Sequence, residues 1–240
     1  LFTTVGAAVA AAASGDTILI ANDATAYTEP ANTTVTINKT LNLAGVGSKA
    51  PVLRNTATRF CTISNAVTVS ITSLALQGNG TGGGIDNNGT LTLSNSTLSN
   101  NTVSGGSNNF GGGISNNGTL TLSNCTLSGN SANFGGGVLN SGTVTLINST
   151  LSGNTAQGGS GGTGFINTGG GGNGADGQGR GGAIYNRNGS VTLASVTVNA
   201  NTAADGAAVE GLGDDASGTL LIQRTIIANS SAAPDCRTVT

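Results

Sequence analysis

The chain has 240 residues, a formal net charge of −2 at pH 7, 8% charged residues and 3% aromatic residues. A chain with so few charged and aromatic residues lacks the positively charged surface and the aromatic side chains that nucleic-acid-binding proteins use to bind phosphates and stack on bases. Histidine is absent, which excludes His-based zinc sites and Ser-His-Asp triads and leaves ten Asp and Glu residues for any acid–base or calcium chemistry.

Residues 1–30 differ from the rest of the chain and predict an end cap followed by a first strand. Four apolar residues recur at helical spacing before Ser14: Val5, Ala8, Val9 and Ala12. This Ala-rich segment is far shorter than the roughly 20 apolar residues of a membrane-spanning helix. We therefore interpret it as a short helix that covers the open edge of the first coil.

Residues 34–63 contain short stretches in which apolar residues alternate with polar ones, as in β-strands. Their spacing is less regular than that of the later sequence. We interpret them as the first, irregular coils of a repeating fold.

An internal repeat dominates the sequence from residue 83 onward. Residues 83–99 read GGIDNNGTLTLSNSTLS, residues 112–128 read GGISNNGTLTLSNCTLS, and later copies begin near residues 136 and 182. One equivalent position is held by five residues: Leu91, Leu120, Val144, Val191 and Leu220. Their separations are 29, 24, 47 and 29 residues. The base period is therefore about 24 residues, with insertions that leave the strand pattern intact.

Within each copy, apolar and polar residues alternate with a period of two, and an Asn interrupts the alternation. This pattern predicts three short strands per copy. Short strands at a fixed period are typical of an all-β, right-handed parallel β-helix, a solenoid, here of about eight coils. We expect residues 31–240 to form this β-helix as a single domain behind the cap of residues 1–30.

Stacking of the copies in register would place equivalent side chains in columns. Two apolar columns would fill the core: Leu93, Leu122, Leu146, Leu193 and Ile222; and Leu98, Leu127, Leu151, Val198 and Ile227. A column of mostly small residues would occupy an inward corner: Ser96, Cys125, Ser149, Val196 and Thr225. Three Asn columns would fill the bends: Asn95, Asn124 and Asn148; Asn101, Asn130, Asn154 and Asn201; and Asn87, Asn116, Asn140 and Asn186. We interpret them as structural, because Asn tolerates left-handed backbone and its amide can bond neighbouring copies.

The longest insertion, residues 157–181, is glycine-rich throughout. Its residues 171–176 match the opening of the calcium-binding nonapeptide G-G-x-G-x-D, but Gln178 stands where a large apolar residue is required. We predict a surface loop here, with no metal site and no cofactor.

The three cysteines have different expected environments. Cys125 falls in the inward column and Cys61 in a core-like strand, so both are expected to be buried thiols. Cys236 follows Pro234 in an expected turn. Residues 228–240 show no capping pattern, so we expect further chain or a second copy to cover the last coil.

The repeat resembles that of the bacterial right-handed β-helix surface proteins of the polymorphic outer-membrane-protein type. It carries their arrangement Gly-Gly-Gly-Ile, then Gly-Thr-Leu-Thr-Leu-Ser-Asn-Ser-Thr-Leu-Ser, and residues 15–18, 41–47 and 226–229 resemble the ends of the same β-helices. The resemblance implies a bacterial, secreted or cell-surface protein with a structural or adhesive role. It also implies that Cys236 pairs beyond Thr240.

These features favour a non-catalytic, adhesin-like extracellular module. It would act as a rigid rod that presents loops, or as a subunit that stacks end to end into a filament. The expected partners are a second copy or cell-surface and polysaccharide ligands, with no nucleic acid and no membrane span.

The first alternative is a polysaccharide-binding or polysaccharide-cleaving β-helix enzyme. Such a site needs carboxylates clustered on neighbouring coils, whereas Asp86 has Ser115 as its counterpart in the next copy. The other candidates are the pair Asp214–Asp215 and the residues Arg180 and Arg187 beside the insertion. No catalytic residue is predicted.

The second alternative is ice binding through a Thr-x-Thr ladder on one flat sheet. The candidate surface residues are Thr90, Thr92, Thr119, Thr121, Thr143, Thr145 and Thr192. The ladder ends in the fifth copy, where Leu221 replaces a Thr. A plainer interpretation stays open, because Thr is also a favourable exposed strand residue.

Overall fold

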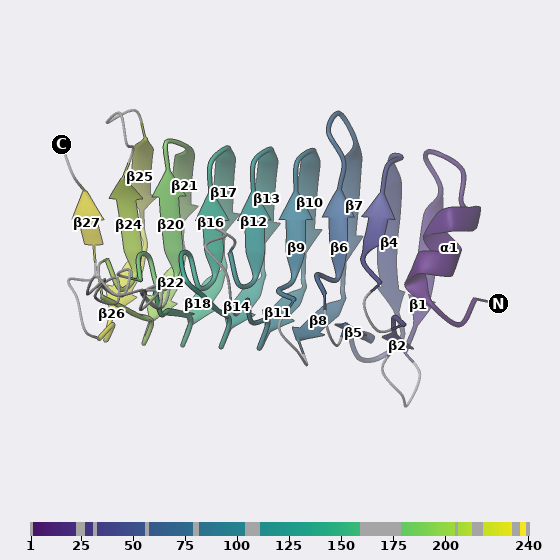
Figure 1. Ribbon diagram of the computed structural model, residues 1–240, viewed down its shortest axis with the longest axis horizontal. Helices are drawn as coiled ribbons and strands as arrows, with labels where there is room; N and C mark the ends of the chain where they lie inside the picture. The colour runs from purple at the N-terminus through teal and green to yellow at the C-terminus, as the bar shows by residue number, and fades with distance from the viewer. Residues whose placement is uncertain are drawn as a thin grey trace, which may run out of the picture.

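The computed structural model describes residues 2–22, 27–30, 33–55, 58–78, 82–103, 111–158, 179–204, 206–212, 218–231 and 236–238. They form a stack of β-coils with one short helix, α1 (Val5–Ala11), at its N-terminal end (Figure 1). All other regular structure of the described residues is β-strand. The predicted all-β solenoid is therefore confirmed.

Each coil contributes one strand to each of three sheets, and each sheet contains eight strands in parallel pairing. Sheet A consists of β1 (Thr17–Ala21), β4 (Leu41–Val46), β7 (Thr68–Thr72), β10 (Thr90–Ser94), β13 (Thr119–Ser123), β17 (Thr143–Ile147), β21 (Ser190–Ala194) and β25 (Thr219–Gln223). Sheet B consists of β2 (Tyr27–Thr28), β5 (Val52–Asn55), β8 (Ala75–Gly78), β11 (Thr97–Ser99), β14 (Thr126–Ser128), β18 (Thr150–Ser152), β22 (Thr197–Asn199) and β26 (Ile226–Ala228). Sheet C consists of β3 (Val35–Ile37), β6 (Cys61–Ile63), β9 (Ile85–Asn87), β12 (Ile114–Asn116), β16 (Val138–Asn140), β20 (Ile184–Arg187), β24 (Val209–Leu212) and β27 (Cys236–Thr238). The three strands per coil and the eight strands per sheet agree with the sequence-based prediction.

A fourth, three-stranded sheet lies between sheets B and C along the chain and was not predicted. It consists of β15 (Ser131–Ala132), β19 (Thr155–Ala156) and β23 (Thr202–Ala203). Each of these strands follows a buried Asn by one residue, so the Asn-Ser/Thr-Ala sequence was the available signal. At the far end of the chain, Cys236 begins β27 and pairs with Val209, which corrects its expected place in a turn.

The apolar columns occur as the repeat predicts. Leu93, Leu122 and Leu146 are register partners on successive strands of sheet A, and none of their side chains is exposed. The column continues through Leu193 to Ile222, which is 40% exposed in the last strand of the sheet. The second apolar column runs through sheet B with equal continuity. Register therefore converts the sequence repeat into one continuous core.

Two of the three Asn columns form buried hydrogen-bonded ladders. In the first, each amide nitrogen donates to the next side-chain oxygen at 2.9–3.0 Å: Asn101, Asn130, Asn154 and Asn201. In the second, the corresponding distances are 2.7–2.8 Å: Asn87, Asn116, Asn140 and Asn186. Every Asn in both ladders is at most 2% exposed. The ladders thus satisfy buried amides while tying each coil to the next.

The third Asn column is exposed, and its residues occupy left-handed backbone positions instead of forming a buried ladder. Asn95, Asn124 and Asn148 lie at the corner between sheets A and B with φ of 49–53°. The equivalent Ser73, Ser195 and Arg224 have φ of 46–57°. This corner needs left-handed backbone, which Asn adopts at lower cost than most residues.

Side chains from the first coil hold α1 at both ends. Glu29, which is 3% exposed, accepts hydrogen bonds from the backbone nitrogens of Val5 at 2.7 Å and Gly6 at 3.1 Å. At the other end, Lys39 Nζ donates to the carbonyl oxygens of Ala10 at 3.3 Å and Ala12 at 2.8 Å. A carboxylate at the N-terminus and an ammonium at the C-terminus both complement the helix dipole. Because a helix of seven residues is not stable alone, these contacts and the burial of its apolar side hold it on the stack.

Replacing Glu29 with alanine is expected to release α1 from the first coil. The substitution leaves the N–H groups of Val5 and Gly6 without their charged acceptor, at a cost of about 2–3 kcal/mol. Hydrogen exchange should show loss of protection in α1 while the central coils stay protected. Lys49→Ala, a change at an exposed residue, is the control. Unchanged exchange in α1 of the Glu29→Ala variant would contradict this role.

Candidate binding surface

The two carboxylates that share a register position in sheet C lie far apart. Asp86 and Glu210 occupy the same position of the sheet C register, but Ser115, Leu139 and Tyr185 separate them. Four strand spacings amount to about 19 Å, whereas the carboxyl groups of a glycosidase lie roughly 5–9.5 Å apart. The described part of the chain also contains no group of three or more metal-ligating residues.

Arg180 and Glu210 lie close together on the outer side of sheet C. The Arg180 Nε to Glu210 Oε1 distance is 3.9 Å, and the Glu210 side chain is fully buried. Tyr185, on the neighbouring strand, packs against Phe134 with ring centroids 5.7 Å apart. The sequence analysis did not align Glu210 with Asp86. A signal was available, because Ala207–Ala208 stands where the other copies begin with two small residues.

The structure describes only part of the other candidates from the sequence. Arg187 ends β20 and is half-buried. Asp214–Asp215 and the calcium-like residues 171–176 lie outside the described residues, as does most of the insertion at 157–181.

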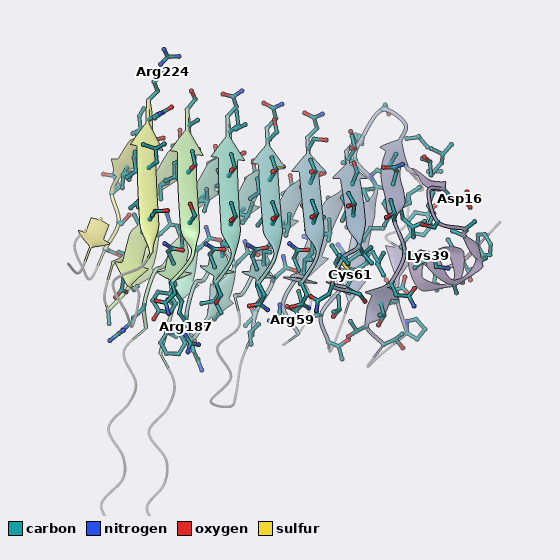
Figure 2. The ribbon with its side chains drawn as sticks, turned by 90° about the horizontal axis from the view of Figure 1, so that it is seen from above. Asp16, Lys39, Arg59, Cys61, Arg187 and Arg224 are labelled. Atoms are coloured by element: carbon teal, nitrogen blue, oxygen red, sulfur yellow. The ribbon has the colours of Figure 1, made fainter. Side chains whose placement is uncertain are left out.

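The seven predicted surface threonines lie together on the outward face of sheet A. They alternate with buried apolar residues such as Leu91 and Leu93, so the pleat turns them all outward. The outer row contains Thr90, Thr119, Thr143, Ser190 and Thr219 as successive register partners. The middle row contains Thr92, Thr121, Thr145 and Thr192 as successive register partners, and ends at Leu221. Figure 2 shows such short, oxygen-tipped side chains repeating from strand to strand.

Both rows begin one coil earlier than the sequence analysis placed them. Thr68 pairs with Thr90, which extends the outer row, and Ser70 pairs with Thr92, which extends the middle row. The segment Val67–Thr68–Val69 fits the frame of the repeat in the sequence, but its threonine was not included in the predicted ladder. The outer row thus spans six adjacent strands and the middle row five.

The outward face of sheet A is uncharged along its full length. Every outward residue of its eight described strands is a Thr, Ser, Asn or Gln, or an aliphatic residue. Arg224 follows β25 at the corner and projects beyond the strand end rather than over the face (Figure 2). Hydroxyl and methyl groups are therefore the main chemistry that this face offers: it can donate and accept hydrogen bonds but supplies no general base or metal ligand.

The two described thiols are buried away from this surface. Cys61 and Cys125 are free and buried, as the sequence predicts. Desolvation, with a smaller contribution from the Asp86 charge, raises the pKa of the Cys61 thiol to about 12. Burial also raises the pKa of Cys125. Neither group has the lowered pKa of a reactive thiol.

Burial of Cys61 predicts a loss of stability in alkali. The unfolded thiol ionises near pH 8.5, while the folded thiol keeps its proton up to about pH 12. Its contribution to stability is therefore complete below about pH 8.5 and falls by about 1.4 kcal/mol per pH unit above it. Urea unfolding across the alkaline range should show a shallower decline for Cys61→Ala than for the wild type. Equal declines would contradict this assignment.

No family model matches the chain, and no curated protein matches it either. Among the described residues, no helix is both long and apolar enough to span a membrane.

Proposed function

We propose that this chain is a non-catalytic structural or adhesive module of an extracellular protein, in which the β-helix acts as a rigid rod. The observation that carries the proposal is the continuity of the stack. Three parallel sheets run through eight coils, and two buried Asn ladders bond the central coils directly to one another.

Rigidity follows from these contacts. Bending or opening the rod between two central coils would break backbone hydrogen bonds in all three sheets and the side-chain bonds of both Asn ladders, and would leave buried amides unsatisfied. Such a body suits a protein that holds a surface or its loops at a fixed distance. The resemblance of the repeat to bacterial surface β-helices supports the extracellular location.

The arrangement of the charged groups supports a non-catalytic role over polysaccharide cleavage. The two aligned carboxylates are four strands apart, and the Glu210 side chain beside Arg180 is fully buried. A glycosidic bond would have to reach both a proton donor and a base or nucleophile at once.

Brief protease treatment of intact source cells, followed by mass spectrometry of the released peptides, tests the location. Peptides of this chain should be released before those of a cytoplasmic marker. Their appearance only after lysis would overturn the proposal.

The purified chain should also release no reducing ends or unsaturated sugars from a panel of polysaccharides. Release that disappears in an Arg180→Ala variant would assign a catalytic role instead. Electron microscopy of the same sample distinguishes single rods from filaments.

A further inference from the structure

We propose that the outward face of sheet A binds the surface of ice, a function that goes beyond the structural role and does not depend on it. The site comprises the outer row and the middle row of hydroxyl-bearing residues. Its centre is the pair Thr119 and Thr121 on β13, which has other row-bearing strands on both sides.

The first argument is a two-dimensional repeat. Neighbouring strands place equivalent residues about 4.8 Å apart, and alternate residues along one strand lie about 6.7 Å apart. Both spacings are close to the two repeats of the oxygen lattice on the prism face of ordinary ice. Five adjacent strands carry both rows in unbroken register, so the two-dimensional repeat extends over about 19 Å of the rod, and the outer row alone over about 24 Å.

The second argument is that the hydroxyls are held in place before any contact forms. Thr is β-branched, so its χ1 angle is restricted on a strand. Except on β25, the last strand of the sheet, the backbone beneath each row residue is fixed by sheet pairing on both sides and by neighbouring apolar residues with no exposed surface, such as Leu120 and Leu122. Little conformational entropy remains to be lost when an ordered lattice meets this face.

The third argument is the chemistry that the face lacks. A charged side chain would hold its own hydration shell and disturb a neutral water lattice, and the outward face of the described sheet A strands carries none. It also carries no aromatic ring, the group that most often forms a platform for sugar rings. Ice therefore fits this face better than a polysaccharide does.

Sheet B supplies an internal comparison. Thr97, Thr126, Thr150 and Thr197 are also register partners, but Ala75 precedes this row and Ile226 ends it. Its second row passes from Gln77 through three serines to Asn199. The repeat on sheet B is thus shorter and chemically mixed, and we assign ice binding to sheet A alone.

Thermal hysteresis and ice shaping by the purified chain at millimolar concentration test the proposal. The wild type should separate the melting and freezing points and shape ice crystals. Thr121→Tyr places a ring in the middle row and should reduce the hysteresis to the level of buffer. Thr126→Tyr, the matched change on sheet B, should leave it unchanged. Circular dichroism and the urea midpoint of both variants establish that they remain folded.

Three results would overturn the proposal. The first is no hysteresis and no ice shaping by the folded wild type. The second is an equal loss of hysteresis in the two folded variants. The third is retention of the wild type on crystalline chitin or cellulose that Thr121→Tyr abolishes, without any hysteresis, because the face would then be a polysaccharide surface.

Discussion

Replacing Asn130 with alanine is expected to lower the free energy of unfolding by about 3–6 kcal/mol, because several buried polar groups lose their partners at about 1–3 kcal/mol each. The Asn130 side chain accepts from the backbone and side-chain nitrogens of Asn101 at 3.0 and 2.9 Å. It donates to the Asn154 side chain at 2.9 Å and to the Leu98 carbonyl at 3.1 Å. Urea unfolding followed by circular dichroism would measure the loss.

Asn117→Ala is the matched control for Asn130→Ala. Asn117 is exposed, and its side chain donates to Asn88 at 2.9 Å. Its removal should change stability by no more than about 0.5 kcal/mol. Similar losses in the two variants would show that the buried ladder contributes no more than an exposed pair of amides.

Replacing Leu122 with alanine is expected to cost about 2–5 kcal/mol, the range for removing a large aliphatic side chain from a packed core. Leu122 lies in the middle of sheet A between Leu93 and Leu146, and all three are fully buried. The cavity would be enclosed by neighbouring coils that the Asn ladders hold in place, so collapse around it would be limited.

Leu221→Ala makes the same chemical change at an exposed site and is the control for Leu122→Ala. Leu221 is 51% exposed on β25. Its loss should cost less than about 1 kcal/mol. Equal midpoints of urea unfolding for Leu122→Ala and the wild type would contradict the columnar core.

The core was predictable because one rule connects the sequence to its geometry. Once Leu93, Leu122 and Leu146 are aligned by the repeat, parallel stacking alone requires them to lie over one another, as they do. The same rule places Asn116 beside Asn140 and Thr121 beside Thr145. The register between neighbouring strands depends on the alternation of apolar and polar residues, and every copy of the repeat carries this alternation.

Features outside the repeat were harder to predict. The contact of Glu29 with the N-terminus of α1 joins residues 23–24 positions apart that share no pattern. The burial of Glu210 beside Arg180 is not described by strand periodicity, because Arg180 lies outside the repeated strands. The different roles of Asn124 and Asn130 depend on backbone conformation, since only Asn124 lies in the left-handed region.

The connections from the three-stranded fourth sheet to sheet C differ greatly in length between successive coils. Five residues join β15 to β16, whereas twenty-seven join β19 to β20, yet Leu139 and Tyr185 remain register partners. The entropic cost of closing a flexible loop rises by only about 0.6 kcal/mol for each doubling of its length. Foreign peptides grafted at this corner should therefore leave the columns undisturbed. Peptides grafted into successive coils would then be presented at fixed intervals of one strand spacing along the β-helix.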